Sequence, residues 1–211
     1  MEAYFTEWVR QEESLVSSFL LAISSNDTAD QLHLISLALA HIESYYLHKS
    51  RFAQGDVVEA FYPRYLTPFE RTFLWLGGFR PSLLFKFVPH GRSDAMIHLK
   101  RSVSVEEKEM SKEMASLQEG LAARELLDAI RSADMCMMMN RDLERVVAEV
   151  GATLRALLAS ADRLRLCTLR GIRDALMSMS APTDAAMFFA KAMNFHLQLH
   201  RFGLQYHNRD N

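Results

Sequence analysis

The sequence contains little glycine and little proline, and this shortage excludes a protein built mainly of short strands. Among 211 residues there are 8 glycines and 5 prolines, while 49% of the residues are apolar and 24% are charged. Short strands joined by tight turns need glycine and proline, whereas long helices contain few of either. A chain of this length can bury one sizeable core. The composition therefore predicts an all-α fold of long helices.

Basic excess, cysteine and long apolar runs are also scarce. The 24 basic and 26 acidic side chains give a net charge of −2, whereas nucleic-acid-binding proteins usually carry a clear basic excess. The two cysteines, Cys136 and Cys167, make neither a disulfide framework nor a CxxC metal motif. No apolar run reaches the roughly 18 residues of a membrane span, and the charged N-terminus is not a secretory signal. We expect a nuclear or cytoplasmic protein that does not bind nucleic acid directly.

Apolar residues recur at intervals of three and four along most of the chain, which is the period of an amphipathic helix. In the first such stretch, residues 3–24, only Glu12 breaks the apolar stripe. Further helices are predicted before Gly55, over residues 82–88, in a long region that follows a capping box at Ser104, and over residues 163–179 and 182–204. Asn140 and Gly151 are candidate breaks in the long region.

The polar residues 90–103 have no helical period and are predicted to form a flexible loop. No internal repeat and no convincing strand pattern is present. The sequence therefore predicts a single domain over residues 1–211, a multi-helix bundle with long antiparallel helices.

The strongest local signal is a capping box at Thr67 and Glu70. The Thr67 side chain can accept from the amide of Glu70, whose carboxylate can return to the amide of Thr67, and Pro68 suits the first helical position. The helix that begins there is predicted to continue to Gly77 and Gly78, which stop it because glycine tolerates positive φ.

No constellation of catalytic residues accompanies these helices. The sequence lacks the GxSxG, HExxH and GxGxxG motifs and a glycine-rich phosphate loop. Glu70 and Arg71 near Trp75 resemble a catalytic carboxylate site, but capping already accounts for Glu70. The Gly77-Gly78 pair lacks the strand that precedes a phosphate loop. We therefore expect a protein that is not an enzyme.

His196 and His200 are the candidate ligand-binding residues. They lie four residues apart on the last predicted helix, so both project from one face. Such a pair can chelate a metal ion, but it cannot easily supply both axial ligands of one haem, which approach from opposite sides. If haem binds, one of the two is the ligand. The alternative is that both are partly buried polar side chains on a nearly all-apolar helix. No other metal site is predicted.

Several segments resemble the Delay of Germination proteins of land plants and the C-terminal half of TGA-type bZIP transcription factors. Residues 67–82 read TPFERTFLWLGGFRPS and match that family's block TPxERxFLWxGGFRPS. Residues 41–49 resemble the family's HYxxxxxxK helix with Ile42 in place of tyrosine, and residues 161–169 resemble its ADxLRxxTL element. The signature residues, expected to be structural, are Thr67, Pro68, Glu70, Arg71, Trp75, Gly77, Gly78, Phe79 and Arg80.

The resemblance implies a non-enzymatic regulatory protein that promotes seed dormancy in abscisic acid signalling. It implies binding of clade A protein phosphatases through the N-terminal segment, where Phe5, Glu7 and Trp8 are the matching positions. It also implies haem binding by histidines near the domain end, where His196 and His200 stand.

Other branches of the resembling family leave two alternatives open. One is a transcription-linked co-regulator that pairs with a bZIP or TGA-like factor, and the other is a pollen-aperture factor with peripheral membrane association. TGA factors carry a basic region and zipper before this domain, whereas here Met1 leads directly into the first predicted helix. We therefore expect no element that enters a DNA groove. Assembly into a homo-oligomer stays open.

Overall fold

The computed structural model describes residues 1–89, 93–121, 140–179 and 182–207, and these are mostly helical. The long helices are α1 (Glu2–Ser24), α2 (Thr28–Gly55), α5 (Asp94–Leu121), α7 (Asn140–Met179) and α8 (Pro182–His207). The short ones are α3 (Val57–Phe61), α4 (Pro68–Arg71) and the 3₁₀ helix η1 (Pro81–Lys86). Within the described residues the only β pairing is one isolated bridge between Trp75 and Gly78. The prediction of an all-α fold is confirmed.

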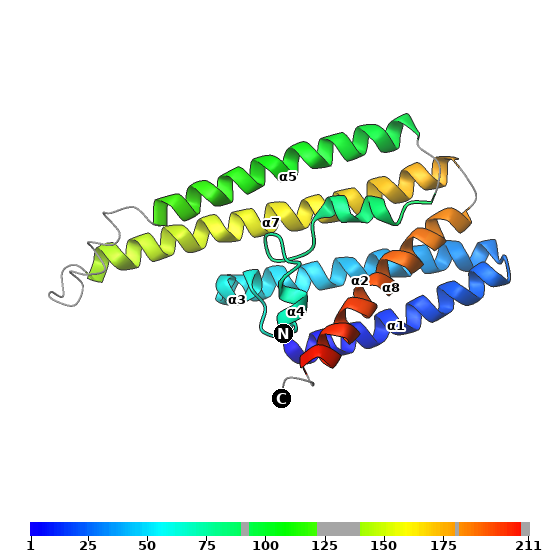
Figure 1. Ribbon diagram of the computed structural model, residues 1–211, viewed down its shortest axis with the longest axis horizontal. Helices are drawn as coiled ribbons and strands as arrows, with labels where there is room; N and C mark the ends of the chain where they lie inside the picture. The colour runs from blue at the N-terminus through cyan, green and yellow to red at the C-terminus, as the bar shows by residue number, and fades with distance from the viewer. Residues whose placement is uncertain (90–92, 122–139, 180–181, 208–211) are drawn as a thin grey trace.

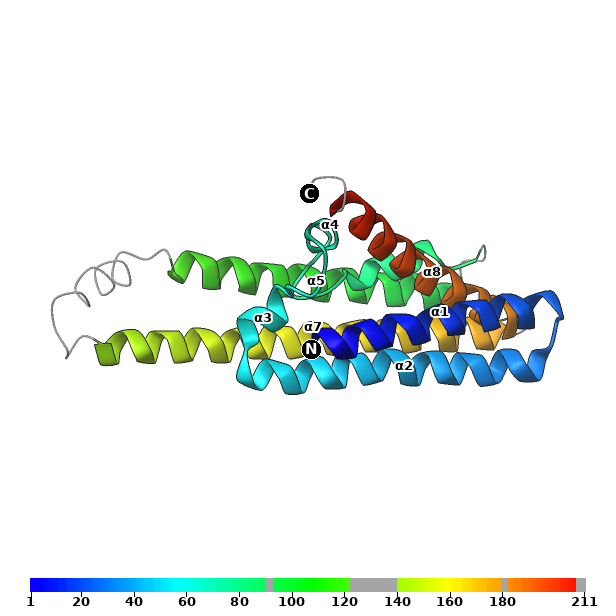
Figure 2. The same cartoon turned by 90° about the horizontal axis from the view of Figure 1, so that it is seen from below.

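The long helices form two groups, and α2 of the first group packs against α7 of the second (Figure 1). Helices α1, α2 and α8 pack on one another, while α5 and α7 run side by side in opposite directions and extend beyond the other helices. Figure 2 shows the same antiparallel pair from below, with α4 beside the end of α8. None of the described helices is long and apolar enough to cross a membrane.

The main core lies between α1, α2, α7 and α8. Phe19 of α1 and Phe189 of α8 are both completely buried, and their rings lie parallel with centroids 6.3 Å apart. Burying each such side chain contributes roughly 1.5–3 kcal/mol. On α2, Ile35 and Ala38 are buried against the same cluster. The apolar stripes that predicted these helices are therefore the surfaces by which they pack.

Two helices begin with side-chain caps. Asp27 accepts from the amide of Asp30 at 3.0 Å and starts α2. At α4, Thr67 and Glu70 form the predicted reciprocal capping box, with a proline at the first position. The capping box predicted at Thr67 and Glu70 is therefore confirmed, whereas the cap at Asp27 was not predicted.

The predicted loop over residues 90–103 is wrong for most of its length, because α5 begins at Asp94. Met96 and Val103 are buried, seven residues apart on one face of the helix, and Ser93 accepts from the amide of Met96 at 3.1 Å. The predicted start at the Ser104 capping box is therefore about three turns too late. The apolar contacts are sparse, so the polar residues between them concealed the period. Residues 90–92 lie outside the described part.

Three other predicted boundaries need correction. The helix at the Thr67 capping box ends at Arg71 and does not continue to the glycine pair. The segment over residues 82–88 is a 3₁₀ helix that spans Pro81–Lys86. Gly151 does not interrupt α7, which is continuous through it. In the first case buried side chains from other helices bind the backbone carbonyls beyond Arg71, as described below.

Candidate functional site

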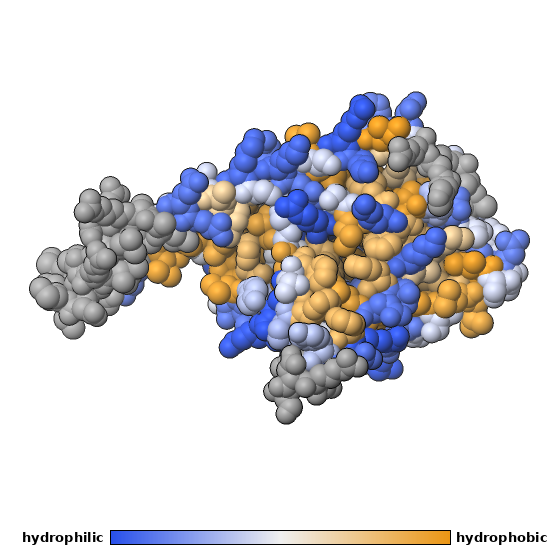
Figure 3. Space-filling view, viewed as in Figure 1, coloured by the Kyte–Doolittle hydropathy of each residue, from blue (hydrophilic) through white to orange (hydrophobic). Residues whose placement is uncertain are grey.

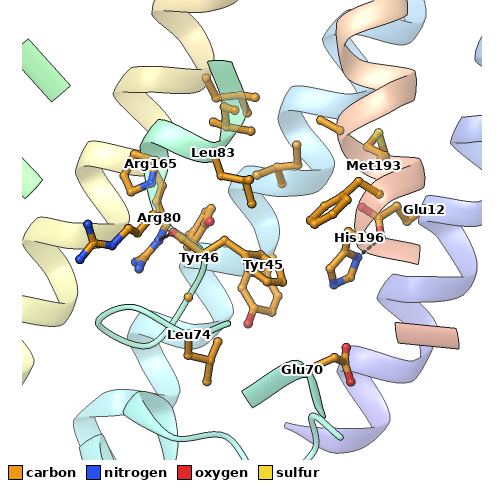
Figure 4. Close-up of a pocket in the computed structure, with 18 of the residues that line it drawn as sticks. Glu12, Tyr45, Tyr46, Glu70, Leu74, Arg80, Leu83, Arg165, Met193 and His196 are labelled. Carbon is orange, nitrogen blue, oxygen red and sulfur yellow. Dashed lines mark hydrogen bonds and ion pairs between the residues drawn. The ribbon is translucent and has the colours of Figure 1, made fainter. Parts of the chain in front are cut away.

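A cavity of about 150 Å³ lies between α1, α2, α8 and the segment from Leu66 to Phe87 (Figure 4). Most of its wall is apolar, with Tyr45, Leu83 and Met193 among the lining residues. Its ionisable lining residues come from separate segments of the chain: Glu12, Glu70, Arg80, Arg165 and His196. An apolar hollow with a few convergent ionisable groups is the usual form of a ligand site.

His196 on α8 is held against Glu12 on α1 at one side of this cavity (Figure 4). The Nδ1 atom of His196 lies 2.5 Å from Oε2 of Glu12, whose side chain is only 3% exposed. Burial disfavours the protonated imidazole, but the Glu12 carboxylate outweighs this effect and raises the pKa of His196. The pair forms a charge-assisted hydrogen bond that ties α8 to α1.

His200, one turn further along α8, binds a second buried glutamate. Its Nδ1 atom lies 2.9 Å from Oε1 of Glu70, while Oε2 of Glu70 accepts from the amide and hydroxyl of Thr67 at 2.8 and 2.7 Å. Burial acts to raise the pKa of Glu70, but the hydrogen bonds from His200 and Thr67 outweigh it and lower that pKa. Glu70 therefore caps α4 and also ties it to α8.

His41 on α2 completes the polar layer between the helices. Its ring stacks on Trp8 with centroids 4.4 Å apart, and the indole N–H of Trp8 donates to the backbone carbonyl of His41 at 3.0 Å. The Nε2 atom of His41 is buried and has no hydrogen-bond partner. Burial and the nearby His196 lower the pKa of His41 to about 4, so this ring is neutral at pH 7.

The three residues expected to contact a partner differ in their placement. Phe5 and Trp8 are 4% and 7% exposed and belong to the main core. Glu7 lies on the surface, where its carboxylate accepts from Arg10 at 2.6 Å and from Gln11 at 2.9 Å. Only Glu7 can touch a partner while α1 keeps its place. Contact through Phe5 or Trp8 would require α1 to leave the core.

The glycine pair of the signature block forms a tight turn between Trp75 and Gly78. The two central residues, Leu76 and Gly77, have φ of 47° and 70°, which is the conformation of a type I′ turn. A leucine in this conformation is unusual and costs energy. A Cβ atom on Gly77 would lie 2.6 Å from Cδ1 of Leu158. This position therefore requires glycine.

Two buried cations hold the carbonyls of this turn. Lys49 of α2, which is completely buried, donates to the carbonyl of Gly77 at 2.6 Å. Arg165 of α7 donates to the carbonyls of Trp75, Leu76 and Phe79. A continued α-helix would direct these carbonyls into its own hydrogen bonds, so the two cations favour the turn over the predicted helix.

Asp162 of α7 supplies the negative charge that these cations need. Its Oδ1 atom accepts from Lys49 at 3.0 Å and from Arg165 at 2.5 Å. Burial lowers the pKa of Lys49 to about 8, although Asp162 opposes this shift. We call Lys49, Asp162 and Arg165 the buried triad. The sequence offered all three inside segments of family resemblance, but it gave no sign that they meet.

The indole of Trp75 connects the turn to α5. Its N–H donates to Ser111 at 3.0 Å, and the guanidinium groups of Arg80 and Arg165 each lie 5.5 Å from its ring centre. Arg71 lies over the ring of Tyr62 at 5.0 Å. In the structure, the signature residues therefore bind other parts of the fold.

The resemblance predicts haem binding, and the structure has one feature that favours it and one that disfavours it. Because the Nδ1 atoms of His196 and His200 contact carboxylates, Nε2 is the atom left for iron, and a carboxylate on the second nitrogen is usual for a metal-bound histidine. The free space of about 150 Å³, however, matches a cavity that accepts benzene. The donor atoms fit haem, whereas the cavity in this shape does not hold a porphyrin. In the described part of the chain, no three His, Cys, Asp or Glu residues are grouped to hold a metal ion.

The fold and the site together define a helical protein whose signature block forms a turn held by a buried triad and whose last helix is tied by two histidine–glutamate pairs. Comparison with known proteins identifies a family and several proteins to which the chain is similar. The family described as "DOG1: Seed dormancy control" matches residues 15–89. The chain is 28% identical to Protein DOG1-like 4 of Arabidopsis thaliana, over 97% of the chain and 92% of that protein.

Two further relatives extend the comparison. Protein RESPONSE TO ABA AND SALT 1 of Arabidopsis thaliana is 26% identical over 91% of the chain and 90% of that protein. Transcription factor TGA2.3 of Oryza sativa subsp. japonica is 26% identical over 82% of the chain but only 55% of that factor, so the chain spans about half its length. The resemblance is confirmed: the chain is similar to Protein DOG1-like 4 along nearly its whole length and to part of the TGA factors.

Proposed function

We propose that this protein regulates seed dormancy by binding other proteins, clade A protein phosphatases of abscisic acid signalling among them. The observation that carries the proposal is similarity along nearly the whole chain to DOG1-like 4 and to a protein named for its response to abscisic acid and salt. The family whose model matches residues 15–89 is described as controlling seed dormancy, which supports a regulatory role.

An exposed aromatic patch supports a role in protein binding. Phe73, Phe202 and Tyr206 are 44%, 51% and 56% exposed, and Phe69 lies between them, with ring centroids 5.3, 4.7 and 6.3 Å away. Apolar surface gathers where α4 meets the end of α8 (Figure 3). Contiguous exposed apolar side chains often mark surfaces that bind another protein.

Binding to a recombinant clade A phosphatase tests the proposal, with Glu7→Arg as the variant. Glu7 is exposed and bonded only to its own helix neighbours, Arg10 and Gln11, so its reversal should leave Tm within about 2 °C. We expect the Kd for the phosphatase to rise at least about tenfold, a change of about 1.4 kcal/mol.

Glu2→Arg is the matched control, because Glu2 is exposed on the same helix, and its Kd should not change. Failure of the folded wild-type chain to bind any clade A phosphatase would refute this part of the proposal.

Haem is proposed as a modulating ligand at His196 or His200, and its binding requires the cavity beside His196 to widen, because a porphyrin does not fit its volume of about 150 Å³. Titration of the protein with haem should give a shifted Soret band that weakens in His196→Ala or His200→Ala. His33→Ala is the control, since His33 is exposed on α2. An unchanged spectrum in the His196→Ala, His200→Ala double variant would exclude this site.

The alternative is a transcription-linked co-regulator that acts in the nucleus with a TGA-like bZIP factor. The similarity to TGA2.3 and to Transcription factor TGA2 of Arabidopsis thaliana, at 28% identity over 80% of the chain, favours it. Co-purification with a recombinant TGA factor, in the absence of phosphatase binding, would select this alternative.

A further inference from the structure

A groove runs between α2 and α7, on the side of α2 that α1 and α8 do not cover. It has a free volume of about 330 Å³. The residues of α2 that line it recur along one face of the helix: Glu43, Tyr46, Leu47, Ser50, Ala53 and Gln54. The residues of α7 that line it do the same over sixteen positions: Arg155, Leu158, Ala159, Asp162, Arg163, Leu166, Cys167 and Arg170.

The dimensions of the groove fit an α-helix. The distance along α7 from Arg155 to Arg170 is roughly 22 Å, or about four helical turns. Ser50 and Ala159 are small and exposed, and they allow a third backbone to approach closely, while Leu47 is 53% exposed beside them. A long trough between two antiparallel helices, with an apolar floor, is the form in which an amphipathic helix docks.

The charges on the groove select the partner. Arg163 and Arg170 are exposed, and Arg155 is partly exposed. Arg170 is bound by Glu43 at 2.7 Å, and the other acid of the groove, Asp162, is buried and occupied within the buried triad. Neither Arg155 nor Arg163 forms an ion pair with any described residue. The groove therefore has positive charge left for a partner's carboxylates.

We propose that the α2–α7 groove binds an amphipathic helix of a partner protein that carries Asp or Glu along the side of its apolar stripe that faces α7. This rests on the proposed function only in that the protein acts by binding other proteins. The apolar stripe contacts Leu47 and Leu166, and the carboxylates pair with Arg155 and Arg163.

Two synthetic helical peptides of about four turns test the proposal by fluorescence anisotropy. Both carry the same leucine stripe, flanked in one by Glu and in the other by Lys. The wild-type protein should bind the Glu peptide at least about tenfold more tightly. The Arg155→Glu, Arg163→Glu double variant should reverse this preference, and Leu47→Asp should weaken binding of both peptides. Lys191→Glu, an exposed change on α8, should alter neither.

Cys167 reports where the peptide binds, because it is exposed inside the groove. In a Cys136→Ser background, the Glu peptide should slow the reaction of Cys167 with N-ethylmaleimide at least about fivefold. Equal affinity for the two peptides, or binding without protection of Cys167, would overturn the proposal. So would a wild-type dimer in solution that the double variant converts to monomer, since the groove would then hold a second copy.

The same variants separate this inference from the proposed function. If a clade A phosphatase or a TGA factor binds the wild type and the Arg155→Glu, Arg163→Glu variant equally well while the Glu peptide fails, the groove proposal is wrong and the regulatory function stands. If neither partner binds the wild type but the Glu peptide does, the groove proposal stands and the proposed regulatory function is wrong.

Discussion

Two buried polar clusters hold this fold together, and they differ in the chemistry of their charges. The buried triad joins α2 and α7 to the turn at Trp75–Gly78 through a lysine, an arginine and an aspartate. The histidine–glutamate pairs join α8 to α1 and α4. Arginine stays charged at every physiological pH, whereas histidine changes its charge near neutrality. The arginine of the triad therefore keeps its charge, whereas Lys49, whose pKa is lowered to about 8, and His196, whose pKa is raised, respond to pH.

The clusters also differ in what lies beside them. Lys49 and Arg165 of the triad bind backbone carbonyls, so the triad fixes the signature turn. His196 borders a cavity and stands near His41, whose Nε2 atom has no partner. Incomplete hydrogen bonding around a cavity is typical of sites that bind or respond. We therefore assign structure to the triad and responsiveness to the end of α8.

The largest effect should come from removing the centre of the triad. Asp162→Ala leaves two buried cations without a counter-ion, and such a loss costs about 3–5 kcal/mol. Urea unfolding at pH 7 measures it. Asp174→Ala is the control, since Asp174 is exposed on the same helix and pairs only with its neighbour Arg173. If the two variants were equally stable, the triad would not hold the fold.

A smaller effect is expected at the turn itself. Gly77→Ala adds a Cβ atom 2.6 Å from Leu158 at a φ of 70°, and strain with overpacking should cost about 2–3 kcal/mol. Gly151→Ala, where the new Cβ meets only the Arg155 side chain at 3.5 Å inside α7, should instead stabilise by about 0.5–1 kcal/mol. Thermal unfolding of both variants shows whether replacing glycine by alanine lowers the stability at the turn and raises it inside α7.

The smallest effect, on the order of 1 kcal/mol, should appear as a pH dependence of the histidines. The pKa of His196 is raised, so its pairing with Glu12 stabilises the fold fully below its usual pKa of 6.5 and is lost as pH rises through the folded value. The stability gap between wild type and His196→Gln should therefore narrow from pH 6 to pH 9. Urea midpoints across this range measure it. A gap that widens would contradict the assignment.

His41 should show the opposite sign, which makes it an internal control. Its folded pKa of about 4 lies below the usual 6.5, so the unfolded chain binds the extra proton and acid destabilises the fold between these values. His41→Gln should lose less stability than wild type between pH 6.5 and pH 4. The comparison with wild type at each pH removes the contributions of Glu70 and His196, whose pKa values are also shifted.

Much of the fold could be predicted because its causes are local. Apolar residues at intervals of three and four determined the long helices, and the Thr67–Glu70 capping box determined the start of α4. Glu12 was visible as the one break in the first apolar stripe, and it is the partner of His196. An isolated acid on an otherwise apolar face was thus a usable signal for a buried pair.

The long-range pairings could not be predicted in the same way. Lys49 and Asp162 are 113 positions apart, and sequence spacing carries no information about such a distance without a fold. The prediction that the helix continues past Arg71 was wrong for this reason: Lys49 of α2 and Arg165 of α7 bind the carbonyls that a longer helix would use.

The sequence by itself determined the helical class, the scarcity of turns and the capping of α4, since helix period and capping depend on neighbours within a few residues. Only the tertiary structure decided that the scarce glycines at 77 and 78 form a turn held by a buried triad, and that His196 and His200 bind glutamates of two different helices. Buried charges must be paired, but the partner is set by which helices pack together, and packing is a property of the whole chain.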